Sequence, residues 1–361
     1  MQVKSIKGHF LNEFEKELSS VIYNDFEPDL AIVFCSVSQN INELRKIFKK
    51  KNIDLLGATS AGEIFNHTVS EKSIVALLLK FEKATYCLDF YNNERSDLRK
   101  LGEQAASEIS KKISDPSVIV LSGGIMADGE ELVKGLTEKY INKNNIFGAL
   151  AGDDLQMKNT YVFTGKKSTN NGIVCLAFDN SMVKTKGLAT SGWQSIGTEK
   201  LITRSRGNVV FSIDNKPALD VFLEYFNKPK EHIELNDLVI SELAQYPLQV
   251  MRGNDYSVLR APLIADKDKG ALIFSGTVQQ GSRIKFSVPP GFETIENTTK
   301  EISKIKDSIP EADAIILFSC KARHQALGPL VEEEIEGIQN LWNVPLIGFF
   351  SYGEIGSIGN H

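Results

Sequence analysis

The 361-residue sequence predicts an α/β protein of repeated βα units, with mostly parallel sheets, antiparallel additions and two modules that share a crevice. Three observations predict this class. An apolar run that leads to a glycine and ends at an acid occurs three times, as Gly57 to Glu63, Gly148 to Asp154 and Gly348 to Glu354. Each copy follows a continuously apolar run, which is typical of a strand buried on both faces, and an amphipathic helical segment. The composition, 42% hydrophobic and 24% charged, is that of an ordinary globular protein.

The first unit follows from the periodicity of the apolar residues. Spacings of three and four residues predict helices, and uninterrupted apolar runs predict buried strands. We expect the two strands after the first glycine loop to form a hairpin through Glu82 and Lys83. The expected elements are a helix within 1–28, a strand at 29–35, a helix at 41–48, a strand at 53–56, and strands at 73–79 and 84–90.

The second unit repeats this order and is followed by alternating segments. The alternation between residues 182 and 213 is typical of antiparallel strands, and Pro217 suits the first turn of a helix. The expected elements are a helix at 98–113, a strand at 118–121, a helix at 130–140, strands at 145–147, 160–164 and 172–178, strands within 182–193 and 200–213, and a helix at 217–226.

The third unit closes the chain, and we expect a boundary between modules 1–226 and 227–361. In the first two units a long apolar strand follows the glycine loop. The sequence stops at His361 before such a strand, so we expect a neighbouring strand edge to be unpaired. The expected elements are strands at 248–251, 256–264, 271–275 and 283–287, a helix at 293–305, a strand at 314–318, a helix at 330–341 and a strand at 344–349.

Charge and hydropathy exclude several classes of protein. The formal net charge of −5 gives no basic surface, so nucleic-acid binding is not expected. No secretory signal opens the sequence, and the longest apolar run, Ile74 to Leu79, is too short to span a bilayer. We therefore expect a cytoplasmic protein, in which Cys35, Cys87, Cys175 and Cys320 are buried free thiols.

The glycine-acid loops are the expected ligand site. A glycine just beyond a parallel strand lets a ligand approach the backbone, and open α/β sheets bind ligands beyond their strand ends. An acid there could hold an ammonium group and an arginine could hold a carboxylate, which together suit an amino acid or a similar zwitterion. Each acid could instead only brace its own turn. The candidate ligand residues are Ser60, Gly62, Glu63, Gly152, Asp153, Asp154, Arg260, Arg323, Tyr352, Gly353 and Glu354.

The order of these motifs resembles the FIST family of sensory and signal-transduction domains. The segments Gly148–Asp154, Gly192 to Gly197 and Asp214 to Leu219 resemble the N-terminal module of the family. Four further segments resemble the C-terminal module of the family. They are Arg260-Ala261-Pro262, Gly276 with Gly281, Phe318-Ser319-Cys320 with Arg323, and Gly348 through Gly356. Each motif is unspecific by itself, but their order over about 330 residues is specific.

The resemblance implies a sensory module that binds a small ligand and signals through a separate partner, such as a histidine kinase or a cyclic-nucleotide enzyme. Because some members bind haem and sense nitric oxide, a haem-binding gas sensor is the alternative function, with His67 or His324 as the axial ligand. No cofactor is expected otherwise, and the histidines show no metal-binding spacing.

A hydrolase is the third possibility. The stretch Gly57 to Gly62 is one residue out of register with a nucleophile elbow, and Ala151 stands where the second copy would need a nucleophile. The sequence therefore favours binding over catalysis.

Overall fold

The computed structural model describes residues 1–24, 26–81, 86–93, 97–139, 141–228, 234–252, 256–289 and 291–356. The chain forms two compact units, and each unit is built from segments that are not contiguous in the sequence. The first unit holds Met1–Thr190, Ile295–His324 and Gly328–His361, and the second holds Ser191–Thr294 and Gln325–Leu327. The third repeat therefore folds with the first two. The module boundary expected at residue 226 stays a prediction.

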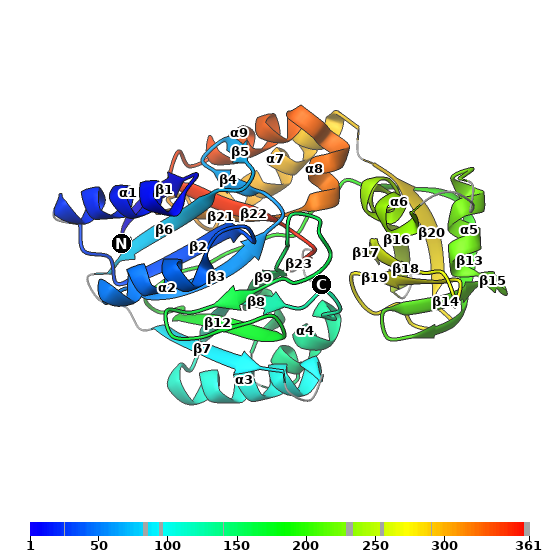
Figure 1. Ribbon diagram of the computed structural model, residues 1–361, viewed down its shortest axis with the longest axis horizontal. Helices are drawn as coiled ribbons and strands as arrows, with labels where there is room; N and C mark the ends of the chain where they lie inside the picture. Colours follow the sequence, from blue (N-terminus) through cyan, green and yellow to red (C-terminus); the bar gives the residue numbers. More distant parts are fainter. Residues whose placement is uncertain are drawn as a thin grey trace. The chain divides into compact units, whose positions relative to one another are not determined.

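The first unit contains three sheets (Figure 1). The first sheet has the order β1 (Gln2–Gly8), β6 (Ile74–Lys80), β2 (Leu30–Ser36), β3 (Asp54–Ser60), β10 (Val162–Phe163) and β11 (Ser168–Thr169). The second has the order β23 (Gly353–Ile355), β9 (Ile146–Leu150), β8 (Pro116–Gly123), β12 (Gly172–Asp179) and β7 (Tyr86–Asn92). The third has the order β21 (Ile315–Cys320), β22 (Leu346–Ser351), β4 (Glu63–Phe65) and β5 (Thr68–Ser70).

Each sheet is built around one parallel pair from one repeat: β2 with β3, β8 with β9, and β21 with β22. The strand after each glycine-acid loop pairs with a strand of a different repeat. β4 pairs with β22 of the third repeat, β10 pairs with β3 of the first, and β23 pairs with β9 of the second. The three repeats are therefore linked in a cycle, which brings their loops together within one unit.

Helices cover these sheets, and several begin at a side-chain cap. Asn40 accepts a hydrogen bond from the Glu43 amide, and Asp128 accepts hydrogen bonds from the amides of Glu130 and Glu131. The helices of the repeats are α1 (Leu11–Tyr23), α2 (Ile41–Lys50), α3 (Leu98–Lys112), α4 (Gly129–Thr137), α7 (Glu293–Lys306), α8 (Lys321–Leu327) and α9 (Val331–Gln339), with the 3-10 turns η1 (Lys143–Asn145) and η3 (Gly328–Leu330).

The apolar core of the first unit has three parts. α1 and α2 pack against one face of the first sheet, and α3 and α4 pack against the second sheet (Figure 1). A third cluster joins residues of all three sheets, including Phe34, Leu121 and Phe349. β2 and β8 are buried along their whole length, which agrees with their apolar runs at 30–35 and 118–121.

The second unit is an eight-stranded antiparallel sheet with two helices. Its core includes Phe222 of α5 and Phe274 and Phe286 of the sheet. The strand order is β17 (Tyr256–Arg260), β16 (Leu248–Arg252), β20 (Arg283–Val288), β13 (Gln194–Arg206), β14 (Val209–Ile213), β19 (Ala271–Phe274) and β18 (Pro262–Asp266), with β15 (Lys216–Pro217) on β14. The helices are α5 (Ala218–Tyr225) and α6 (Leu235–Ser241), and η2 (Leu243–Gln245) follows. The α/β class and the antiparallel additions are confirmed, but the sheets are not mostly parallel: each sheet of the first unit has one parallel pair, and its other described pairings are antiparallel.

The helix expected within 1–28 is confirmed as α1, but the strand before it was not expected: residues 2–8 form β1, which pairs along its whole length with β6. One expectation for the first repeat was wrong. The expected hairpin of 73–79 with 84–90 does not form, because β6 pairs with β1 and β2 whereas β7 pairs with β12 in another sheet. Glu82 and Lys83 lie outside the described residues.

Two expectations for the later segments were also wrong. Residues 184–193 are irregular rather than strand, and the long strand β13 begins only at Gln194. The strand expected at 256–264 is two strands, because β17 pairs with β16 and β18 pairs with β19 at the two ends of the sheet.

All four cysteines are free; Cys35 and Cys175 are buried, but Cys87 and Cys320 are only half-buried. Over the described ranges, no helix is both long enough and apolar enough to cross a bilayer.

Candidate functional site

The strand registers define which loop residues are equivalent. Gly57 lies opposite Val33, Gly148 opposite Val120 and Gly348 opposite Leu317 in the three parallel pairs. Counting from these glycines, the acids Glu63, Asp154 and Glu354 occupy the same position in their loops. Their surroundings differ, and the differences show which acid is available to a ligand.

Glu63 is fully buried and fully used by its own repeat. Its Oε1 accepts a short hydrogen bond from Ser60 Oγ, and its Oε2 accepts bonds from the amide and the hydroxyl of Ser73 at 2.8 and 2.7 Å. Burial raises the pKa of Glu63 to about 7 against the opposing effect of these donors. This carboxyl group therefore links the end of β3 to the start of β6.

Asp153 organises the second loop, which contains several residues with positive φ. Its carboxylate accepts hydrogen bonds from the backbone amides of Met157, Lys158 and Asn159 at 2.7–3.0 Å. The hydroxyl of Tyr352 donates to Asp153 Oδ1 at 2.5 Å and accepts from the Leu155 amide at 2.9 Å. Both side chains are buried. They hold the second loop to the third, and this fixes the backbone that presents Asp154.

Asp154 is half-buried and has a φ of 53°. Its Oδ2 accepts a hydrogen bond from Ser36 Oγ at 2.6 Å, and Ser36 Oγ is 2.6 Å from Ser38 Oγ. Burial raises the pKa of Asp154. Ala151 stands in this loop where the others have Ser60 and Ser351, so Asp154 has no hydroxyl partner in its own turn. The hydroxyl that donates to Asp154 comes instead from Ser36 at the end of β2.

Lys321, which the sequence did not single out, supplies the cation of this cluster. It follows β21 directly and is only 7% exposed. Its Nζ lies 3.1 Å from His324 Nδ1 and 3.5 Å from Glu71 Oε1. Burial lowers the pKa of Lys321, while Glu71, Asp154 and Glu63 act in the opposite direction. The charges of these acids therefore favour the protonated form of Lys321.

His324 stacks on Phe350 with ring centroids 4.2 Å apart. Burial, together with the charge of Lys321, lowers the pKa of His324 to about 4, so the ring is neutral at pH 7. Because an ammonium group only donates, Nδ1 accepts from Lys321 and the ring proton lies on Nε2. His67, the other residue considered for haem, is exposed in the turn between β4 and β5.

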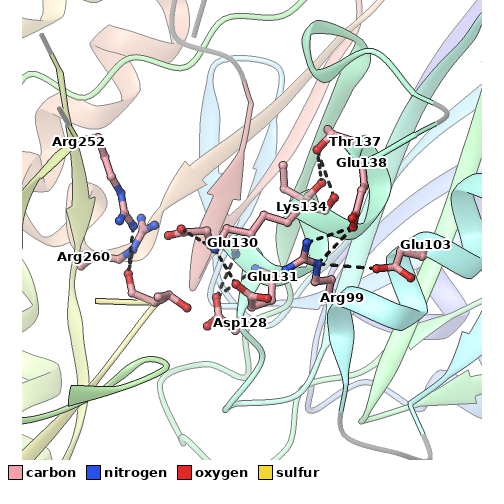
Figure 2. Close-up of polar contacts among 12 residues, drawn as sticks. Arg99, Glu103, Asp128, Glu130, Glu131, Lys134, Thr137, Glu138, Arg252 and Arg260 are labelled. Atoms are coloured by element: carbon pink, nitrogen blue, oxygen red, sulfur yellow. Dashed lines mark hydrogen bonds and ion pairs between the residues drawn. The ribbon is translucent and has the colours of Figure 1, made fainter. Parts of the chain in front are cut away.

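The arginines expected to bind a carboxylate are occupied elsewhere. The guanidinium of Arg323 is buried and donates from Nε to Glu334 Oε2 at 2.8 Å, from Nη2 to Glu334 Oε1, and from Nη2 to Thr298 Oγ1 at 3.1 Å. Arg260, labelled in Figure 2, belongs to the second unit. Its Nε donates to the Thr277 carbonyl at 3.1 Å and its Nη1 to the Leu259 carbonyl at 2.9 Å.

The remaining predicted residues belong to the backbone of the loops. Gly62 has a φ of 124°, and a Cβ added at Gly152 would lie 2.6 Å from the Ala61 amide nitrogen. Gly353 begins β23, and Glu354 is exposed and accepts a hydrogen bond from Ser351. These glycines let the first and second loops approach each other closely.

The cluster can bind charge, and its arrangement offers less for catalysis. Ser60 donates to Glu63, and in the described part of the chain it has no hydrogen bond to a histidine. No group of three or more His, Cys, Asp or Glu suited to a metal ion is found among those residues. What the strand ends present is a half-buried acid, a buried lysine, two serine hydroxyls and a neutral histidine.

Comparison with known proteins identifies the family. The sequence model of the FIST N domain matches residues 29–216, and that of the FIST C domain matches residues 218–357. The uncharacterized protein Rv0628c of Mycobacterium tuberculosis H37Rv is 21% identical over 221 residues, 60% of this chain and 57% of its own length. Mb0898c of Mycobacterium bovis is 23% identical over 176 residues, 47% of this chain and 45% of its own. The chain thus spans about half the length of these relatives. Because the two domain matches cover most of the chain in order, it belongs to the FIST family.

Proposed function

We propose that this chain is a sensory domain that binds an amino acid or a similar zwitterion at the strand ends of the first unit. FIST domains are in general sensory domains of signal transduction, so binding is the expected activity of the family. The observation that carries the choice of ligand is that the strand ends present a half-buried acid, Asp154, and a buried lysine, Lys321, whose pKa burial lowers and the charge of Asp154 acts to raise. Among the described residues Asp154 Oδ1 has no hydrogen-bond donor, which suits a ligand ammonium group, and the poorly solvated ammonium of Lys321 suits a ligand carboxylate.

The ligand would be held by one residue from each repeat. Ser36 belongs to the first repeat, Asp154 to the second and Lys321 to the third. A ligand that joins these groups stabilises the packing of the three repeats on one another. This change is the signal that a separate partner, such as a histidine kinase or a cyclic-nucleotide enzyme, would detect.

Haem remains the alternative ligand. The residues fit it less well as they are arranged, because Nδ1 of His324 accepts from Lys321 and Nε2 carries the proton. An iron ligand needs a free lone pair on a ring nitrogen. Haem binding through His324 would therefore require the ring to change tautomer and leave Lys321.

A thermal-shift panel of amino acids tests the proposal. We expect at least one amino acid to raise the Tm of the wild type by a few degrees at saturating concentration. The shift should be lost in Lys321→Met and in Asp154→Asn. The exposed pair Glu108 and Lys111 on α3 provides matched controls, Glu108→Gln and Lys111→Met, which should keep the shift.

Three results would contradict the proposal. The first is a shift that persists in both site variants. The second is a silent panel with a haem Soret band that disappears in His324→Ala, which would establish the gas-sensor alternative. The third is a silent panel with measurable ester hydrolysis that depends on Ser60.

A further inference from the structure

The turn between β5 and β6 carries an acid, Glu71, beside the candidate site. Hydrogen bonds hold this turn in place. The Ser36 amide donates to the Ser73 carbonyl at 3.1 Å, and Gln39 Nε2 donates to the Lys72 carbonyl at 2.7 Å. The turn is therefore fixed against the end of β2, which carries Ser36 of the candidate site.

The carboxylate of Glu71 has acceptor capacity that the protein does not use. Its side chain is 66% exposed, and its Oε1 lies 3.5 Å from Lys321 Nζ. A well-formed hydrogen bond between an ammonium group and a carboxylate is about 2.7–2.9 Å long, so this contact is weak. Across the described ranges, Glu71 has no other hydrogen bond or ion pair. A cation of a ligand can therefore bind Glu71 without breaking a strong interaction.

A second acid in the same region is already occupied. The charge of Glu332 acts on His324, as that of Glu71 does. However, Glu332 Oε1 accepts a hydrogen bond from the Val69 amide at 2.8 Å. Of these two acids, Glu71 is therefore the one whose carboxylate is available to a ligand.

The charge of Glu71 acts on three side chains of the candidate site. Burial lowers the pKa of Lys321 and of His324, and the charge of Glu71 opposes both effects. Burial raises the pKa of Asp154, and the charge of Glu71 raises it further. Since His324 is neutral at pH 7, Lys321 is the one cation that faces the two acids. An additional positive charge would be attracted to this arrangement.

We propose that Glu71 selects an amino acid with a cationic side chain, such as lysine, ornithine or arginine, by pairing with the ammonium or guanidinium group at the end of that side chain. This inference rests on the zwitterion site proposed above, where Lys321 pairs with the α-carboxylate of the ligand and Asp154 with its α-ammonium group. Once Lys321 binds the ligand carboxylate, Glu71 is free to bind the second cation of the ligand. An acidic side chain in the same place would be repelled by Glu71 and Asp154, so the site selects by charge.

Lysine and norleucine are the matched ligands for the test, because they differ only in the ammonium group at the end of the side chain. In calorimetric titration at low salt, we expect the wild type to bind lysine about fivefold more tightly than norleucine, which is the effect of an exposed ion pair. The preference for lysine should decrease when the salt concentration is raised, because exposed charges are screened.

Two protein variants separate the role of Glu71 from the general charge of the region. Glu71→Gln removes the charge and keeps the shape of the side chain, so this variant should bind lysine and norleucine with equal affinity. Glu332→Gln removes the same charge from the neighbouring acid and should keep the preference for lysine. Both glutamates are exposed, so both variants should fold, which thermal melts would verify.

The outcomes distinguish this inference from the proposed function. Equal affinity of the wild type for norleucine and lysine would overturn selection by Glu71 and leave the zwitterion site standing. A preference for lysine that persists in Glu71→Gln would also overturn it. If lysine, ornithine and arginine do not bind at all, the inference fails, and the zwitterion site fails with it only if the whole amino-acid panel is silent.

Discussion

The three loop acids show how one residue change can redirect a side chain from its own turn to another repeat. Glu63 and Glu354 each accept a hydrogen bond from a serine three residues earlier in the same loop. The second loop has Ala151 at that place, and Asp154 bonds instead to Ser36 of another repeat. Asp154 and Glu354 each accept one side-chain hydrogen bond among the described residues, but only for Asp154 does the donor come from another repeat. The equivalence of the loops therefore identifies Asp154 as the exception.

The stability contribution of Glu63 should depend on pH. Because burial raises its pKa to about 7 in the folded protein, above the ordinary value of 4.5 for a glutamate, the neutral acid is the form that favours folding. Its contribution is fully present below pH 4.5 and is lost as the pH rises through about 7. Relative to Glu63→Gln, the wild type should lose about 3 kcal/mol in free energy of unfolding between pH 4.5 and pH 8. Urea unfolding of both proteins at several pH values measures this difference, and a constant difference would contradict the account.

Several residues of the candidate site could be named from the sequence, but the lysine beside them could not. Ser60, Glu63, Asp153, Asp154 and Tyr352 lie in repeated loops, and their pattern is visible along the chain. Lys321 has no such pattern. Lys321 could have been identified only by its position, because it is the first residue after the third apolar strand. The sequence pattern indicated Arg323, two residues later, as the cation. Arg323 proved to be held by Glu334, a buried partner that only the folded chain brings to it.

At the scale of elements, α3 and α4 illustrate which interactions decide the packing. Ion pairs of Arg99 with Glu103 and Glu138 join exposed side chains on this surface (Figure 2). Such pairs contribute little, about 0–1 kcal/mol each. The close approach of the backbones depends on glycine instead. A Cβ added at Gly135 would lie 2.0 Å from the Arg99 carbonyl oxygen, and one added at Gly102 would lie 2.6 Å from that of Leu132.

Gly135→Ala should therefore destabilise the first unit, although alanine is the better helix former. Overpacking typically costs about 1–3 kcal/mol, against a gain of about 1 kcal/mol in helix propensity. We expect faster amide exchange in α3 and α4 and a lower urea midpoint. Gly129→Ala in the same helix is the control, since its Cβ would make only ordinary contacts with Leu150 at 3.7 Å or more. Equal free energies of unfolding for the two variants would show that α3 and α4 can move apart to admit the methyl group without loss of stability.

The sequence predicted elements well where one signal dominated. Strands β2, β6, β8 and β12 are continuously apolar, and amphipathic spacing marked α2 and α3. β1 was missed because its alternating polar residues suit the outer strand of a sheet and were read together with the following helix. The predicted hairpin does not form because its two strands pair with strands that are distant in the sequence. The local pattern of apolar residues does not reveal such pairing.

At the scale of the molecule, the cyclic exchange of β4, β10 and β23 is the feature that creates the site. Each of these strands is three residues long or shorter, yet each joins a different repeat. The exchange brings the ends of β2, β9 and β21, which carry Ser36, Asp154 and Lys321, into one unit. The repeat itself could be predicted from the sequence. The exchange could not, because the pairing depends on three-dimensional packing.

Calorimetric titration with matched ligand analogues tests the zwitterion site most directly. The best amino acid from the panel would be compared with its amine, which lacks the carboxylate, and its acid, which lacks the ammonium group. We predict that wild type binds each analogue about ten- to a hundredfold more weakly than the amino acid. Lys321→Met should bind the amino acid no better than the amine, and Asp154→Asn no better than the acid. Equal affinity of wild type for the amino acid and both analogues would contradict the account.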